Sequence, residues 1–267
     1  MIIKCLTENT KLSENLISEH GLSLYIETNG KKILFDTGQT DAFSENAKAM
    51  GIDIADVDML VLSHGHYDHG GGIKKFVELN KKAPIYVNKC VFEPHYNCND
   101  GMEKYIGLDL DLQKSDRFIF TDDEYNIDEN MALYTCNDKS REFYNNAFGL
   151  FEKKNGEYIP DDFRHEQYLL INENNKRILI SGCSHKGILN IENWFKPDVL
   201  VGGFHFMKLS PDNDESAEIL RKAAQQLNSQ KTDYYTCHCT GVEQYEYLKQ
   251  FFGNNLHYVS TGSVIEL

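Results

Sequence analysis

Residues 63–72 read SHGHYDHGGG and follow the apolar run MLVL at positions 59–62. The apolar run predicts a buried strand, and the glycines predict a tight turn that leads into a helix. Between them stand His64, His66, Asp68 and His69. Imidazole and carboxylate groups gathered at a strand end are good ligands for zinc, iron or manganese. We therefore expect a metal site here; the alternative is a solvated polar loop.

Length and composition describe an ordinary globular chain. It has 267 residues, of which 41% are hydrophobic and 25% charged, enough for one large domain or two small ones. A net charge of −14 disfavours a long nucleic-acid substrate, because an acidic surface repels phosphate backbones. The sequence has no signal-peptide core and no run of apolar residues long enough to span a bilayer. We expect a cytoplasmic protein without a membrane partner, and its seven scattered cysteines predict reduced thiols.

The first half of the sequence alternates predicted strands and helices. Asn29-Gly30 separates two strand-like runs and predicts a hairpin over residues 22–35. Apolar residues at helical spacing predict a helix over residues 41–50. Further strands are expected in these ranges: 84–87, 117–121 and 131–135. We expect a lid-like insertion around residues 90–165.

The second half repeats this order of elements. It contains a hairpin over 167–180, a helix over 187–195, a strand over 198–201, an amphipathic helix over 212–230, a strand from Tyr234, and a strand pair around Thr261-Gly262. Two strand-strand-helix halves predict an α/β protein in which two sheets are sandwiched by helices. No linker composition separates the halves, so residues 1–267 are expected to form a single domain.

Three more histidines stand at the ends of predicted strands, where layered folds gather functional side chains. They are His185, His205 and His238. His185 is interpreted as a metal ligand rather than a helix cap, and His238 as a ligand as well. For His205 three roles stay open: it ligates a metal, contacts the substrate or donates a proton.

Other polar and aromatic residues receive more ordinary interpretations. His20 is expected to lie at the surface or to support the site. His95 and His165 are interpreted as ordinary polar residues, and Glu166 as a solvated carboxylate. The aromatic stretch 143–148 is assigned to packing of the lid.

These motifs resemble the metallo-β-lactamase superfamily. Within it, the sequence is similar to the group named for 7,8-dihydropterin-6-ylmethyl-4-(β-D-ribofuranosyl)aminobenzene 5′-phosphate synthase. The segments that carry the resemblance are EHGLS at 19–23, LFDTGQ at 34–39, SHGHYDH at 63–69, SGCSH at 181–185, GGFH at 202–205 and HCTG at 238–241. They extend over nearly the whole chain.

The resemblance implies an αββα four-layer sandwich with a binuclear metal site in the cleft, holding one or two zinc ions, with iron or manganese as alternatives. The implied ligands are His64, His66 and His185 for the first metal, and Asp68, His69 and His238 for the second. Asp36 would support the ligand loop. The superfamily pattern places Gly-Asp where this sequence has Gly182-Cys183, so the bridge between the metals is water alone or Cys183.

The implied activity is that of a metal-dependent hydrolase. Two nearby cations lower the pKa of a bridging water, and the resulting hydroxide attacks carbon or phosphorus. Asp68 and His205 are the candidate catalytic residues, and the expected substrate is a small phosphorylated or ester-containing metabolite, possibly pterin-related. Alternatives are a phosphodiesterase or nuclease of the same superfamily, a redox di-iron protein and a non-catalytic metal-binding module. Two-histidine ligation at His64 and His66 favours hydrolysis over redox chemistry, and a homo-oligomer is left open.

Overall fold

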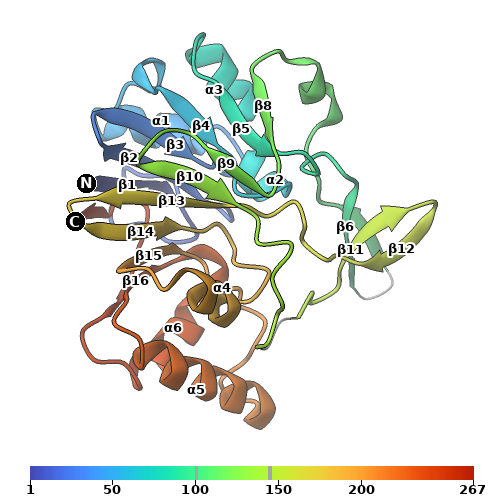
Figure 1. Ribbon diagram of the computed structural model, residues 1–267, viewed down its shortest axis with the longest axis vertical. Helices are drawn as coiled ribbons and strands as arrows, with labels where there is room; N and C mark the ends of the chain where they lie inside the picture. The colour runs from blue at the N-terminus through green and yellow to red at the C-terminus, as the bar shows by residue number, and fades with distance from the viewer. Residues whose placement is uncertain (100–101, 144–145) are drawn as a thin grey trace.

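Two stacked β-sheets form the centre of the molecule, and helices cover both outer faces (Figure 1). The computed structural model describes residues 1–99, 102–143 and 146–267. The predicted αββα sandwich is confirmed by this arrangement. The first sheet has the strand order β18-β1-β2-β3-β4-β5-β8, and the second has the order β17-β16-β15-β14-β13-β10-β9.

The first sheet is built mainly from the N-terminal half of the chain. Its strands are β1 (Ile2–Thr7), β2 (Ser23–Thr28), β3 (Lys31–Phe35), β4 (Met59–Val61), β5 (Ile85–Asn88), β8 (Phe118–Thr121) and β18 (Val264–Glu266). The predicted hairpin is present as β2 and β3. Asn29 and Gly30 adopt φ values of 48° and 73°, which a two-residue type I′ turn requires.

Helices α1 (Ala42–Ala49) and α3 (Ile73–Leu79) cover the outer face of the first sheet, and the short α2 (Tyr67–Gly70) carries part of the metal motif. Helix α1 buries Phe43 and Ala47 against this face. Two single-turn 3₁₀ helices, η1 (Ile54–Asp56) and η2 (Leu110–Lys114), lie in connections of this half.

The second sheet is built mainly from the C-terminal half. Its strands are β9 (Glu124–Asn126), β10 (Met131–Tyr134), β13 (Tyr168–Glu173), β14 (Lys176–Ile180), β15 (Val199–Gly202), β16 (Asp233–Thr236) and β17 (Leu256–Tyr258). Its outer face is covered by α4 (Ile188–Phe195), α5 (Asp214–Asn228) and α6 (Val242–Lys249). Helix α5 begins at Asn213, whose side chain accepts the Ser216 N–H at 3.0 Å, and it buries Leu220, Ala224 and Leu227.

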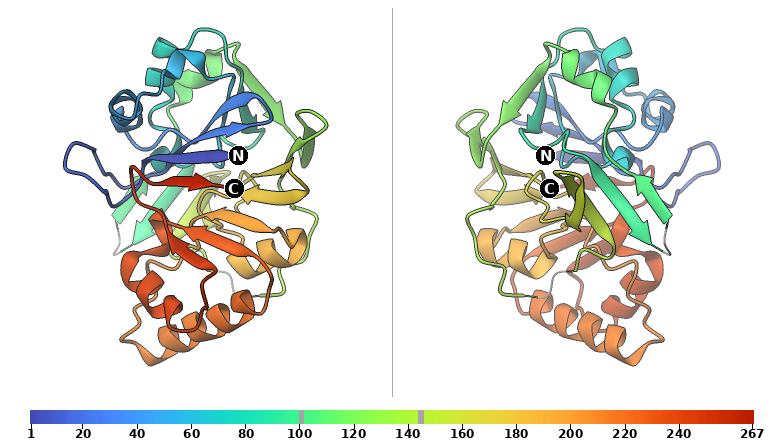
Figure 2. Two further views of the ribbon diagram at one scale, coloured as in Figure 1. Left: turned by 90° about the vertical axis from the view of Figure 1, so that its left-hand side faces the viewer. Right: turned by 90° about the vertical axis from the view of Figure 1, so that its right-hand side faces the viewer.

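Two strands flank Thr261-Gly262 as expected, β17 and β18, but they do not pair with each other. Strand β17 pairs with β16 in the second sheet, whereas β18 crosses to the first sheet and pairs antiparallel with β1. The two chain ends therefore lie side by side (Figure 2). A period-two pattern cannot distinguish these outcomes, because it identifies a strand and not its neighbour.

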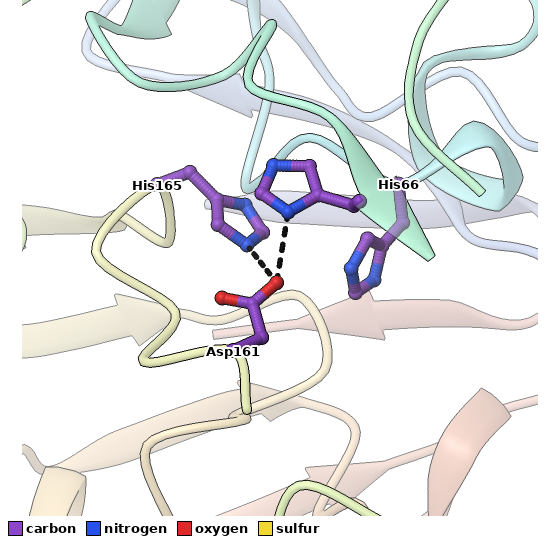
Figure 3. Close-up of side chains that lie close together, drawn as sticks. His66, Asp161 and His165 are labelled. Atoms are coloured by element: carbon purple, nitrogen blue, oxygen red, sulfur yellow. Dashed lines mark hydrogen bonds and ion pairs between the residues drawn. The ribbon is translucent and has the colours of Figure 1, made fainter. Parts of the chain in front are cut away.

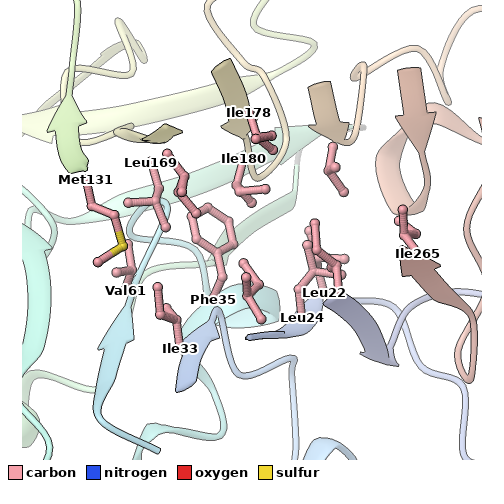
Figure 4. Close-up of a cluster of buried hydrophobic side chains, with 14 of the residues drawn as sticks. Leu22, Leu24, Ile33, Phe35, Val61, Met131, Leu169, Ile178, Ile180 and Ile265 are labelled. Carbon is pink, nitrogen blue, oxygen red and sulfur yellow. The ribbon is translucent and has the colours of Figure 1, made fainter. Parts of the chain in front are cut away.

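The inner faces of the two sheets enclose one apolar core (Figure 4). Leu24, Ile33 and Phe35 of the first sheet face Leu169 and Ile180 of the second, and all five are 0% exposed. The clustered side chains fix the distance between the sheets. Because the ligand-bearing loops extend from both sheets, this core also fixes the separation of the two halves of the site.

Residues 95–160 contain a smaller, separate sheet. It has the order β12-β11-β6-β7, from β6 (His95–Asn99), β7 (Met102–Tyr105), β11 (Leu150–Lys154) and β12 (Glu157–Pro160). Strands β8, β9 and β10 in this region extend the two main sheets instead. The expected lid role stays a prediction, and the aromatic stretch 143–148 lies partly outside the described residues, which omit 144 and 145.

The expected ligand loops follow parallel strands. Strands β3 and β4 are parallel neighbours, as are β14, β15 and β16. Asp36 and the residue 63–70 loop follow β3 and β4, while the SGCSH segment, His205 and His238 follow β14, β15 and β16. Within the described ranges, no helix combines the length and apolar character needed to cross a membrane.

Candidate metal centre

One group of candidate ligands consists of Asp68, His69 and His238. The Nε2 atoms of His69 and His238 lie 3.2 Å apart. The Oδ2 atom of Asp68 lies 3.5 Å from Nε2 of His238 and 3.8 Å from Nε2 of His69. All three residues are buried. They come from both sheets and meet as the second ligand set was expected to do.

A second group surrounds His64. Its Nε2 atom lies 3.3 Å from Nε2 of His185, which brings together one ligand from each sheet. The ring of His66 lies next to both, with its centroid 4.6 Å from that of His64 and 4.9 Å from that of His185. The residues expected to hold the first metal are therefore adjacent.

Cys183 lies between the two groups. Its Sγ is 3.1 Å from Nε2 of His69. The same sulfur forms one compact set of potential ligands with His64 and His185, and another with His69 and His238, with all ligand atoms of each set within 4.8 Å. The thiol thus occupies a position from which it can contact ions held by either group.

In three of the ligand histidines, Nδ1 makes a hydrogen bond to a residue outside the two ligand groups. Nδ1 of His69 lies 2.7 Å from Asp36, and Nδ1 of His238 lies 2.8 Å from the side-chain oxygen of Asn9. Nδ1 of His64 lies 2.8 Å from Oγ of Ser63, which itself donates to Asp36 at 2.7 Å. Each outer acceptor places the ring proton on Nδ1 and leaves the Nε2 lone pair for a metal.

The charges of the site also suit a cation. Burial lowers the pKa of His64 and His185, which keeps their imidazoles neutral and able to ligate. Burial also opposes a charge on His69, but the carboxylates of Asp36 and Asp68 outweigh it and raise its pKa to about 9. The pKa of Asp68 is lowered despite burial because His69 and His238 lie beside it. A bound cation would replace the proton on His69, so the residues present fit a metal ion.

His205 and His20 lie at the edge of the ligand groups. Both line a cavity together with Asp68, His66 and Cys183. His205 adopts a left-handed φ of 57°, and its buried Nε2 has no hydrogen-bond partner in the part of the chain that the structure describes. Its ring centroid is 4.2 Å from that of His185. Nε2 of His20 lies 3.4 Å from Oδ2 of Asp68, and its side chain is 50% exposed.

The ordinary interpretations of His95, His165 and Glu166 are wrong. All three are 0% exposed. Glu166 accepts the backbone N–H of His185 at 2.7 Å, so it fixes the loop that carries this ligand. The adjacent Lys186 is also buried and donates to three oxygen atoms, those of Thr135, Asn137 and Glu166. The following strand begins with four consecutive buried residues, so no alternation along it could have placed Glu166, and its polar character argued for solvent.

Comparison with known proteins agrees with this geometry. The sequence matches the metallo-beta-lactamase superfamily over residues 19–226. The chain belongs to this superfamily. A solved relative, Tm1679, a metal-dependent hydrolase of the beta-lactamase superfamily, superimposes with a TM-score of 0.82 and 28% identity, covering 100% of this chain and 99% of that one.

Two relatives from Methanocaldococcus jannaschii are similar to this metallo-beta-lactamase superfamily member along most of its length. An uncharacterized protein is 32% identical and covers 99% of both chains. The other is named 7,8-dihydropterin-6-methyl-4-(beta-D-ribofuranosyl)-aminobenzene-5′-phosphate synthase. It is 29% identical, covering 93% of this chain and 90% of its own. The resemblance to that named group is therefore confirmed.

Proposed function

We propose that this protein is a metal-dependent hydrolase that acts on a small phosphorylated or ester-containing metabolite. The observation that carries the proposal is that members of both ligand groups border one cavity together with His205. They are His66 and His185 of the first group, and Asp68 and His238 of the second. His64, His66 and His185 would hold one ion, and Asp68, His69 and His238 the other, with zinc the first candidate and iron or manganese the alternatives.

A bound divalent cation would supply Lewis acidity and lower the pKa of a water molecule. In this proposal Asp68 orients the nucleophile and holds its proton. The distances of 3.4 and 3.5 Å from its Oδ2 to Nε2 of His20 and of His238 support the role. In this proposal His205 donates a proton to the leaving group. Its Nε2 has no hydrogen-bond partner among the described residues, and the residue lines the cavity, which supports this role. Asp36, Asn9 and Ser63 orient the ligand imidazoles.

The rest of the cavity wall supports an anionic substrate that contains a ring. Lys104 and Lys208 line the cavity of a protein whose net charge is −14. The rings of Tyr67 and Phe148 lie on the same wall, and Nζ of Lys104 is 3.1 Å from the Tyr67 hydroxyl. This combination suits an aromatic heterocycle with a phosphate or carboxylate group. The name of the synthase relative, which contains a dihydropterin and a phosphate, supports the same class.

The test begins with metal-free protein loaded separately with Zn²⁺, Mn²⁺ or Fe²⁺. Each form is assayed with a phosphodiester, a phosphomonoester and a lactone probe, together with a phosphorylated dihydropterin. We expect turnover that requires metal and that falls at least about 100-fold in Asp68→Asn. His205→Asn should reduce kcat more than KM. Exposed Asp41→Asn provides the matched control.

Failure of every loaded form to turn over any of these probes, with metal bound at full occupancy, would overturn the hydrolase proposal in favour of a binding module. Cleavage of long nucleic acid in preference to the small probes would instead favour a nuclease. We expect the small substrates to be preferred, because the acidic chain repels a long phosphate backbone.

A further inference from the structure

A buried group of polar side chains lies next to His66 (Figure 3). It consists of His95 at the start of β6, with Asp161 and His165 just after β12. One ligand-type atom from each of these residues and from His66 lies within 4.8 Å of the others. Of these four residues, only His66 belongs to a ligand group described above.

Hydrogen bonds fix the protonation of this group. The backbone N–H of Gly65 donates to Nδ1 of His165 at 2.9 Å, so a neutral His165 carries its proton on Nε2, which lies 3.4 Å from Oδ2 of Asp161. The same carboxylate oxygen lies 2.8 Å from Nδ1 of His95. Its other oxygen accepts the N–H of Phe163 at 2.7 Å. Asp161 thus holds the proton of His95 on Nδ1 and leaves a lone pair on Nε2.

Among the described residues, His66 and His185 each have a buried ring nitrogen without the outer contact that the other three ligand histidines make. His64, His69 and His238 each have an acceptor on the ring nitrogen that faces away from the metal site. Nε2 of His66 is buried, and the described residues offer it no hydrogen bond within normal distance. A buried ring nitrogen of this kind requires a partner, and it is a donor when Nδ1 of the same ring binds a metal. Within this group, Nε2 of His95 is the acceptor that has no hydrogen-bond partner among the described residues.

We propose that His95, held by Asp161, pairs with the Nε2–H of His66 and so presents Nδ1 of His66 to the metal. His95, Asp161 and His165 are then positioning residues, and Gly65 ties them to the ligand loop through its N–H. The rings of His66 and His95 lie edge to face with their centroids 5.6 Å apart, a spacing that a bridging water spans or that rotation of the His66 ring closes when a metal binds. The inference rests on the proposed metal site and not on the substrate.

A separate metal ion within this group is a weaker interpretation. Nδ1 of His165 already accepts a hydrogen bond from the Gly65 N–H, so the proton of the neutral ring is on Nε2. Both oxygens of Asp161 accept hydrogen bonds or lie beside imidazole donors. Only His66 and His95 keep a nitrogen for an ion, and two ligands are fewer than the three or four that a protein zinc site uses.

The test measures metal binding without substrate. Metal-free wild type, His95→Phe, His95→Gln and Asp161→Asn are titrated with Zn²⁺ in competition with a chromophoric chelator. We expect His95→Phe and Asp161→Asn to weaken binding about 10- to 100-fold. His95→Gln, whose side-chain oxygen can accept the His66 proton, should recover part of the affinity. Asp162→Asn, the exposed neighbour of Asp161, should bind as wild type does.

Histidine ¹⁵N NMR of the zinc-loaded protein supplies a readout that a purely structural role would not change. We expect His66 to carry its proton on Nε2 in wild type and to lose this fixed tautomer in His95→Phe. Melting curves of the metal-free variants show that each one folds. Wild-type affinity in folded His95→Phe, or a proton on Nδ1 of His66, would overturn the proposal.

Ion counting separates the remaining outcomes. A third ion per chain that disappears in Asp161→Asn would also overturn the proposal, because it would make this group a metal site. Normal metal binding with the expected losses, but no turnover of any probe, would support the positioning role while overturning the hydrolase proposal.

Discussion

The carboxylate of Asp36 lies 2.7 Å from Nδ1 of His69, and both side chains are fully buried. The same carboxylate accepts the backbone N–H and the hydroxyl of Ser63, each at 2.7 Å. Asp36 therefore orients two parts of the ligand loop at once. An Asn at this position can accept on one side-chain oxygen only, so one of these bonds must be lost.

We expect Asp36→Asn to weaken Zn²⁺ binding about 10- to 100-fold, because the His69 ring loses the acceptor that fixes its tautomer. Competition with a chromophoric chelator measures this change. Asp41→Asn, an exposed aspartate of the same loop region, should have no effect. Equal affinities for the two variants would show that the Asp36 contact does not support the metal.

Cys183 provides a spectroscopic prediction. Burial and the neighbouring Cys239 raise the pKa of its thiol, so deprotonation at neutral pH requires a bound cation. In the Co²⁺-loaded protein we expect a sulfur-to-cobalt charge-transfer absorption. Cys183→Ser should abolish it and weaken metal binding at least about tenfold. Cys90→Ser, which changes a thiol that belongs to none of the ligand groups and does not line the cavity, should retain the absorption. An unchanged spectrum in Cys183→Ser would exclude sulfur ligation.

Glu192 offers a prediction about stability and pH. It is 4% exposed, and burial raises its pKa from 4.5 to about 7. The folded state therefore binds this proton more tightly than the unfolded state, and the free energy of unfolding falls as the pH rises from 4.5 through 7. At 1.36 kcal/mol per pKa unit, the loss approaches about 3 kcal/mol above pH 7.

Glu192→Gln removes this ionisation. We expect the free energy of unfolding of the variant to exceed that of wild type by about 1–3 kcal/mol at pH 8, and to equal it near pH 4.5. Urea unfolding of chelated protein across this range measures the difference without a contribution from metal binding. Glu246→Gln, an exposed site on α6, should follow the wild-type curve. A pH-independent difference for Glu192→Gln would contradict the expected ionisation.

Lys104 tests how the cavity recognises charge. Lys104→Gln should raise KM for an anionic probe about tenfold, through loss of a charge-assisted contact, and leave KM for an uncharged lactone unchanged. Lys153→Gln is the matched control. Lys153 also lies on the small sheet, and its Nζ contacts the Tyr158 hydroxyl at 2.9 Å, but it does not line the cavity. Equal shifts for both probes would indicate a general change in the cavity.

Much of the fold could be predicted from local patterns. The Asn29-Gly30 turn, the apolar run before His64 and the amphipathic α5 each carry their own signal, and all are present. The pairing of β18 with β1 could not be predicted in this way. It depends on a contact between the two ends of the chain, which no local pattern specifies.

The candidate site also has one part that the sequence predicts and another that depends on contacts between distant segments. One loop carries four of the candidate ligands close together in the sequence, and their spacing predicts a metal site. They are His64, His66, Asp68 and His69. His95 and Asp161 are 66 positions apart in the sequence, and only the folding of the small sheet brings them to 2.8 Å. Neither residue belongs to a motif with the other, so their partnership with His66 becomes visible only in three dimensions.

The distribution of ligands along the chain also bears on when a metal can be acquired during biosynthesis. His64 and His69 follow β4, but His238 follows β16, after nearly all strands of the second sheet have been made. The loop of residues 63–70 with Asp36 can form an early half-site as the chain leaves the ribosome. The complete ligand set exists only once β16 has joined the second sheet, so a tightly held ion must arrive late, after most of the fold is in place.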